Sequence, residues 1–224
     1  MPDLNFEVVG VEAPAFVAAP MLVFKMRIVN MPSATPTAVL HHTIHNVILH
    51  CQLQIAATRR RYNASSQAKL LDVFGEPPRW QKTLRSLLWT HINVTVPGFT
   101  ESVVVDVPVP CTYDFEVAST KYFTALDEGI IPLNFLFSGT TFYDDEHSNL
   151  CVEQIPWSKE ATYQLPVAVW KEMMEHFYPN SAWIRMDKDT FDQLYRYKTT
   201  YGFPTWETAF AQLLRRTPNE EVHP

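Results

Sequence analysis

Four histidines and a cysteine lie close together in one early stretch of the chain: His41, His42, His45, His50 and Cys51. Imidazole and thiolate are good ligands for zinc, nickel or copper, so this stretch is the candidate metal site. Its spacing is unfavourable, because adjacent strand residues such as His50 and Cys51 point to opposite faces. The weak candidate ligands are therefore His41, His45 and His50, and we favour a His-rich loop that leads into a strand.

A compact basic run, Arg59-Arg60-Arg61, follows that strand. Guanidinium groups bind carboxylate and phosphate groups well, so the run is a candidate contact surface for an acidic partner. The alternative is a solvated connection between a strand and a helix. Because the apolar alternation of the strand ends at Ile55, at least two of the three arginines are expected to reach solvent.

The C-terminal part of the chain is rich in Trp and Tyr. Packing of helices accounts for most of these rings, but Tyr195 and Tyr201 lie partly off the expected apolar faces. Tyr and Trp are common anchors of protein interfaces, so Tyr195 and Tyr201 are candidate interaction residues.

No residue pattern predicts catalysis or a cofactor. The three cysteines form no Cys-X-X-Cys pair, and only six glycines occur, which argues against glycine-rich phosphate loops. A net charge of -6 disfavours a nucleic-acid binder. No apolar run approaches the ~18 residues of a membrane span, and no signal peptide is recognised, so a cytoplasmic location is expected.

Alternation of apolar side chains with period two predicts antiparallel strands through the first two thirds of the chain. The expected strands span residues 4–8, 22–28, 47–55, 92–96, 103–109, 133–137 and 150–155. Strands separated by Pro-rich turns are typical of a sandwich. The expected fold class is therefore α+β: an antiparallel β-sandwich with a helical insertion and a helical C-terminal region.

The insertion is expected at about residues 63–88. Asn63 is a suitable N-cap for a helix that ends at Gly75, and Trp80, Leu84 and Leu88 recur at helical spacing after two prolines.

The apolar period changes to 3.6 near Pro156, which predicts two regions. Residues 1–155 form the sandwich, and residues 156–224 form helices that pack on it. These helices are expected to begin near Pro166, at Asp187 or Asp189, and at Thr205.

Several stretches together resemble an uncharacterised bacterial family, a domain of unknown function seen in actinobacteria and other hydrogen-oxidising bacteria. They include residues 3–8, Leu71-Asp72-Val73-Phe74-Gly75-Glu76-Pro77, Pro108-Val109-Pro110-Cys111-Thr112-Tyr113-Asp114, and Leu165-Pro166-Val167-Ala168-Val169-Trp170. Genes of this family often lie beside those of high-affinity, oxygen-tolerant NiFe hydrogenases, which is an association of gene position and no mechanism.

The resemblance implies a non-enzymatic accessory or assembly protein that contacts a NiFe hydrogenase subunit or a maturation factor. Two alternatives remain open at this point. One is a nickel- or zinc-handling protein that uses the His41–Cys51 region, and the other is an enzyme whose site assembles only in three dimensions.

Overall fold

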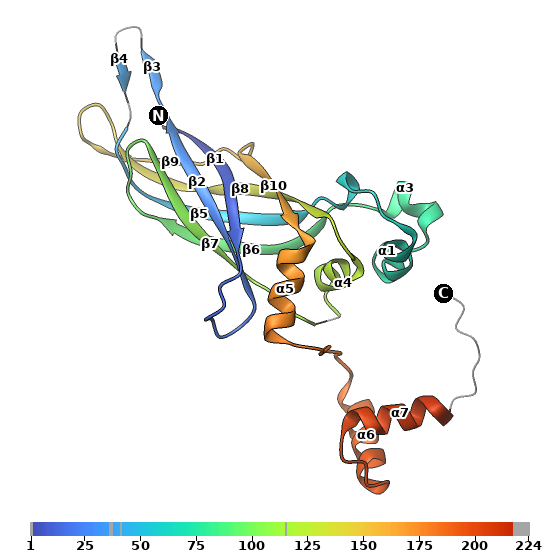
Figure 1. Ribbon diagram of the computed structural model, residues 1–224. Helices are drawn as coiled ribbons and strands as arrows, with labels where there is room; N and C mark the ends of the chain where they lie inside the picture. The colour runs from blue at the N-terminus through green and yellow to red at the C-terminus, as the bar shows by residue number, and fades with distance from the viewer. Residues whose placement is uncertain (1, 36–37, 41, 115, 217–224) are drawn as a thin grey trace. The chain divides into compact units, whose positions relative to one another are not determined.

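The computed structural model describes residues 2–35, 38–40, 42–114 and 116–216, and the chain divides into two compact units, Met1–Ala182 and Trp183–Pro224. The first unit contains the β-sheets and helices α1 to α5, and the second contains α6 and α7 (Figure 1). The strands are β1 Asp3–Glu12, β2 Met21–Met31, β3 Ser33–Thr35, β4 Ala38–Leu40, β5 Ile44–Ile55, β6 Leu87–Val96, β7 Ser102–Pro110, β8 Ile130–Asp144, β9 Leu150–Gln154 and β10 Glu160–Pro166. The helices are α1 Ala64–Lys69, α2 Leu71–Phe74, α3 Trp80–Thr83, α4 Ala118–Ala125, α5 Val167–Phe177, α6 Lys188–Thr200 and α7 Trp206–Arg216.

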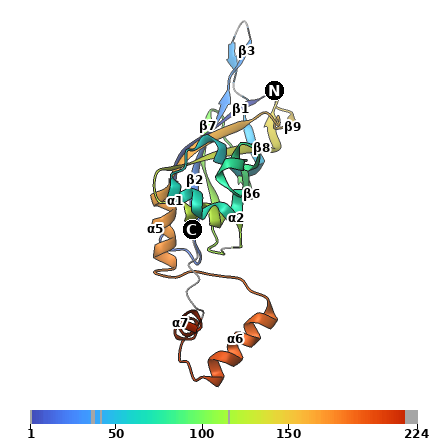
Figure 2. The same ribbon diagram turned by 90° about the vertical axis from the view of Figure 1, so that its right-hand side faces the viewer.

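Two antiparallel sheets form the body of the first unit. One has the strand order β1-β2-β7, and the other has the order β10-β8-β5-β6 with β9 paired to β8. A small ribbon, β3-β4, extends beyond them (Figures 1 and 2). The predicted α+β fold with antiparallel sheets is confirmed.

Aromatic side chains join the two sheets. The rings of Phe6 and Phe137 stack with centroids 4.3 Å apart, and Phe24 meets Phe135 edge to face at 5.1 Å. Phe24 also meets Tyr163 of β10 at 5.7 Å. Because side chains alternate along each strand, these rings lie on the inner faces, and the residues between them project outward.

The outward face of the β1-β2-β7 sheet is charged. Arg27 pairs with Glu7 at 2.5 Å across β1 and β2, and Lys25 lies 2.8 Å from both Glu12 and Asp106. Ion pairs of this kind keep a sheet face solvated and contribute little to stability. The expected strand faces are thus confirmed for β1 and β2.

Gly139 marks the point where β8 exchanges one edge partner for another. Residues before it pair with β10, and residues after it pair with β9. Its φ is +141°, and a Cβ atom there would lie 2.0 Å from the carbonyl oxygen of Ile48 on the neighbouring strand β5. Only glycine fits this close approach of two backbones.

The helical insertion is shorter than predicted. The Asn63 side chain accepts a hydrogen bond from the Ser66 amide at 2.8 Å, which confirms the N-cap, and the helix is broken at Leu70 into α1 and α2. The prediction that helix continues to residue 88 is wrong. Leu87 and Leu88 begin β6 and pair with Ile55 and Gln54, because the ladder to β5 outweighs a short helical pattern.

The boundary between the compact units follows Ala182, whereas the sequence places the change of pattern at residue 156. Residues 160–166 form β10, and α5 belongs to the first unit, where Trp170 is buried and its ring centroid lies 5.3 Å from that of Phe123. Packing of the later helices on the sandwich stays a prediction.

Replacing Phe135 with Ala tests the aromatic core. Its side chain is fully buried against Phe24, so we expect the substitution to lower the free energy of unfolding by about 3–5 kcal/mol. Urea denaturation measures the loss, with Thr162→Ala on the exposed face of β10 as the control. A loss below about 1 kcal/mol would contradict this account of the core.

Candidate interaction surface

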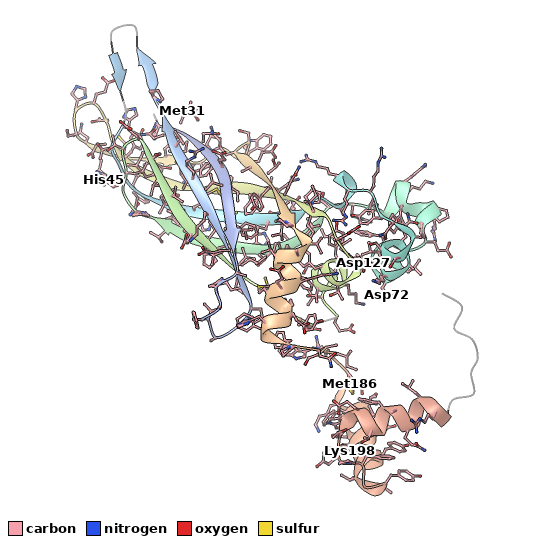
Figure 3. All side chains as sticks on the ribbon, in the orientation of Figure 1. Met31, His45, Asp72, Asp127, Met186 and Lys198 are labelled. Atoms are coloured by element: carbon pink, nitrogen blue, oxygen red, sulfur yellow. The ribbon has the colours of Figure 1, made fainter. Side chains whose placement is uncertain are left out.

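In the predicted metal stretch, His42 and His45 both contact Asp144, whereas His50 contacts Asn93. His45 Nε2 lies 2.7 Å from an Asp144 carboxylate oxygen at one end of β5 (Figure 3), and His42 Nδ1 lies 3.1 Å from the Asp144 carbonyl oxygen. His50 Nδ1 lies 2.7 Å from Asn93 Oδ1 on β6. His41 lies outside the described residues. Among the described residues, no group of three or more His, Cys, Asp or Glu side chains is arranged to hold a metal ion.

His50 and Cys51 point to opposite faces of β5, as predicted. His50 is exposed, whereas Cys51 is buried, and burial raises the pKa of the Cys51 thiol to about 12. Burial likewise raises the pKa of Cys111 to about 12. Both thiols therefore stay protonated near neutral pH, which makes them poor nucleophiles and poor metal ligands.

The three arginines have different environments. Arg59 and Arg61 are exposed, which confirms that at least two reach solvent. Arg59 donates to Asn134 Oδ1 at 3.1 Å. Arg60 is half-buried, and its two terminal nitrogens donate to the carbonyl oxygens of Glu128 and Ile130. Arg60 therefore fastens the turn before β8, while Arg59 and Arg61 remain available for an acidic partner.

Two carboxylates close to α1 and α4 pair with lysines. Asp127 pairs with Lys69 at 2.8 Å, and Asp72 lies 3.6 Å from Lys121 (Figure 3). Hydrogen bonds from Lys69 and Ser65 lower the pKa of Asp127 below its ordinary value. Asp127 and Asp72 are thus paired with lysines of the same unit.

The second unit is a hairpin of two capped helices. The Asp187 side chain accepts from the Thr190 amide at 2.8 Å at the start of α6, and Thr205 Oγ1 accepts from the Thr208 amide at 3.2 Å at the start of α7. Both predicted caps are confirmed, with Asp187 rather than Asp189 in the first. Ala209 is the buried apolar residue that this unit contributes among the described residues.

Aromatic rings of this hairpin gather in two groups. In the first, Trp206 lies 5.6 Å from Phe191, 6.3 Å from Tyr195 and 5.7 Å from Phe210, measured between ring centroids. In the second, Tyr201 lies 4.8 Å from Tyr197 and 6.1 Å from Phe203. Rings from two helices therefore pack against one another, but they do not become buried.

The exposed fractions define the candidate surface. Tyr195 is 52% exposed, Tyr201 is 54% exposed and Phe191 is 43% exposed. The Lys198 ammonium lies 5.7 Å from the centre of the Trp206 ring, on the same hairpin (Figure 3). We call these residues, together with Trp206, the ring surface. Rings that are half-exposed and pre-positioned by helices are well suited to bind a protein partner.

Two exposed aromatic residues were not identified from the sequence. Phe16 lies in the loop between β1 and β2, and Trp157, which is 91% exposed, lies in the turn between β9 and β10. A usable signal existed for Phe16, because residues 13–20 contain no polar side chain.

These features define an α+β protein with a β-sandwich-like unit, a helical hairpin and exposed aromatic surfaces. The chain belongs to the "Family of unknown function (DUF6084)", which matches residues 1–222. No match was found among curated proteins. In the described residues, none of the helices combines the length and apolar character needed to cross a membrane.

Two solved structures show weak similarity. One is the CARDB domain of a Pyrococcus furiosus protein in complex with di-metal ions, at 13% identity and a TM-score of 0.27, covering 74% of this chain and 92% of that chain. The other is a β-glucosidase from Kluyveromyces marxianus in complex with glucose, at 6% identity and a TM-score of 0.25, covering 73% and 15%. Neither similarity is close enough to carry an argument about this chain.

The metal content of untagged protein tests the histidine stretch. His45 and His50 are engaged with Asp144 and Asn93, so we expect less than one equivalent of nickel or zinc by elemental analysis. One equivalent of metal that disappears on replacing His45 and His50 with Ala would contradict this expectation.

Single substitutions test whether Arg60 contributes more to the stability of the fold than the exposed Arg61 does. Arg60→Ala should lower the free energy of unfolding by about 1–2 kcal/mol, because two charge-assisted hydrogen bonds to the carbonyl oxygens of Glu128 and Ile130 are lost. Arg61→Ala, the matched control, should change it by less than about 0.5 kcal/mol. Equal melting temperatures for both variants would contradict a structural role for Arg60.

Proposed function

We propose that this chain is a non-enzymatic accessory or assembly protein that acts by protein–protein contact, in association with a NiFe hydrogenase or its maturation. The association with hydrogenases rests on the sequence resemblance and on nothing else. The mode of action rests on one observation, the half-exposed ring surface of the α6–α7 hairpin.

The ring surface supports this proposal for an energetic reason. Tyr and Trp lose little conformational entropy when they bind, and they bury a large area for each side chain. Phe191, Tyr195 and Trp206 already contact one another, so much of the ordering precedes binding. Arg59 and Arg61 add exposed positive charge on the first unit, which can speed encounter with an acidic partner.

The test is the affinity of the full chain for the purified NiFe hydrogenase of the same organism and, separately, for its maturation factors. Tyr195→Ser should weaken binding to one of them by about tenfold or more, because interface tyrosines are frequent energetic anchors. Trp157→Ser is the matched control, since it removes an exposed aromatic side chain from the first unit.

Circular dichroism of both variants must show unchanged helix content for the comparison to hold. Tyr201→Ser provides a second variant if Tyr195→Ser loosens the hairpin. Equal affinities of wild type, Tyr195→Ser and Tyr201→Ser would remove the ring surface from the interface. Absence of binding to the hydrogenase and to every maturation factor would refute the proposed association.

A further inference from the structure

The loop between β1 and β2 is apolar along its whole length. Residues 13–20 read Ala-Pro-Ala-Phe-Val-Ala-Ala-Pro, and Phe16 is 101% exposed. The loop lies beside α5 in the first unit (Figure 1). Single exposed apolar residues are common on protein surfaces, but a continuous apolar segment with a fully exposed ring marks an interaction site.

A cleft of 350 Å³ lies directly against this loop. Its apolar wall from α5 consists of Val169, Met173 and Phe177, which recur every four residues and therefore share one face of the helix. Met173 is 3% exposed and, like Trp170 and Met174 of the same helix, belongs to the core, whereas Val169 and Phe177 are half-buried beside it. His176 Nε2 lies 3.4 Å from the Ala15 carbonyl oxygen and joins the helix to the loop.

Carboxylates border the cleft. Glu12 and Glu172 both line it, and Glu12 is engaged by Lys25 at 2.8 Å. Glu172 is exposed and forms no salt bridge with any described residue. A ligand that fills the apolar cleft therefore meets an uncompensated negative charge at its edge.

We propose that the 13–20 loop and this cleft bind an amphipathic segment of a protein partner that presents apolar side chains next to Lys or Arg. Phe16 inserts into the apolar side of the segment, and a basic side chain of the segment pairs with Glu172. Apolar contact provides affinity, and the charge pair selects basic segments.

The same carboxylates disfavour two other occupants. In a symmetric dimer formed by this surface, each copy would bring Glu172 to the same small interface, and like charges would oppose each other. An anionic membrane would attract Phe16 but repel the carboxylates. The site lies in the first unit and does not rest on the proposed function, which uses the ring surface of the second.

The experiment measures fluorescence anisotropy of two labelled helical peptides, one amphipathic peptide of Leu and Lys and its counterpart of Leu and Glu. The full chain should bind the Leu/Lys peptide about tenfold or more tightly than the Leu/Glu peptide. Phe16→Ser and Glu172→Gln should each weaken binding of the Leu/Lys peptide about tenfold. Trp157→Ser and Glu160→Gln, which alter an exposed ring and an exposed carboxylate elsewhere, should leave the affinity unchanged.

Four results would overturn the proposal. They are no binding of the Leu/Lys peptide, equal binding of both peptides, wild-type affinity in Phe16→Ser, and wild-type affinity in Glu172→Gln. Light scattering and vesicle sedimentation test the other occupants. A dimer that Phe16→Ser separates, or binding to phosphatidylserine vesicles that Phe16→Ser abolishes, would assign the loop to self-association or to a lipid surface instead.

Discussion

The packing of aromatic rings between two antiparallel sheets is the interaction on which the first unit depends. Phe6 stacks on Phe137, and Phe24 contacts both Phe135 and Tyr163. These contacts hold β1 and β2 against β8 and β10. The packed strands therefore fix the positions of the loops and helices that follow them. The β1–β2 loop and α5, which begins directly after β10, are placed beside one another in this way.

In the second unit, by contrast, the aromatic rings remain partly exposed. The unit is small, and a chain of this size buries too little surface to hide its large side chains. The two helices are well capped, and their rings contact one another, yet Phe191, Tyr195 and Tyr201 stay about half-exposed. Covering such rings with a partner lowers the free energy, which is why we propose a binding role for this unit.

Alternation and capping made most of the fold predictable. Leu4, Phe6 and Val8 lie on one face because strand side chains alternate, and Asn63 and Thr205 cap helices because their side-chain oxygens accept backbone hydrogen bonds. Leu87 and Leu88 were assigned to a helix because a short apolar run fits either period, and only pairing with β5 decides between them.

The candidate sites were less predictable, because they depend on neighbours distant in sequence. The sequence does not distinguish Arg60 from Arg59 and Arg61. Only the structure shows that Arg60 donates hydrogen bonds to the carbonyl oxygens of Glu128 and Ile130. The 13–20 loop carries an apolar signal in the sequence, but the cleft that it shares with α5 depends on contact between segments distant in sequence. Tyr195 and Tyr201, which the sequence places partly off the expected apolar faces, are about half-exposed, and their role in an interaction stays a prediction.

Hydrogen–deuterium exchange of the full chain, alone and with the purified NiFe hydrogenase of the same organism, tests the central claim most directly. An interface on the ring surface predicts that amides of α6 and α7 exchange more slowly in the complex, because a covered hairpin opens less often. Complex formation with unchanged exchange throughout residues 188–216 would contradict the claim that this hairpin is the binding element.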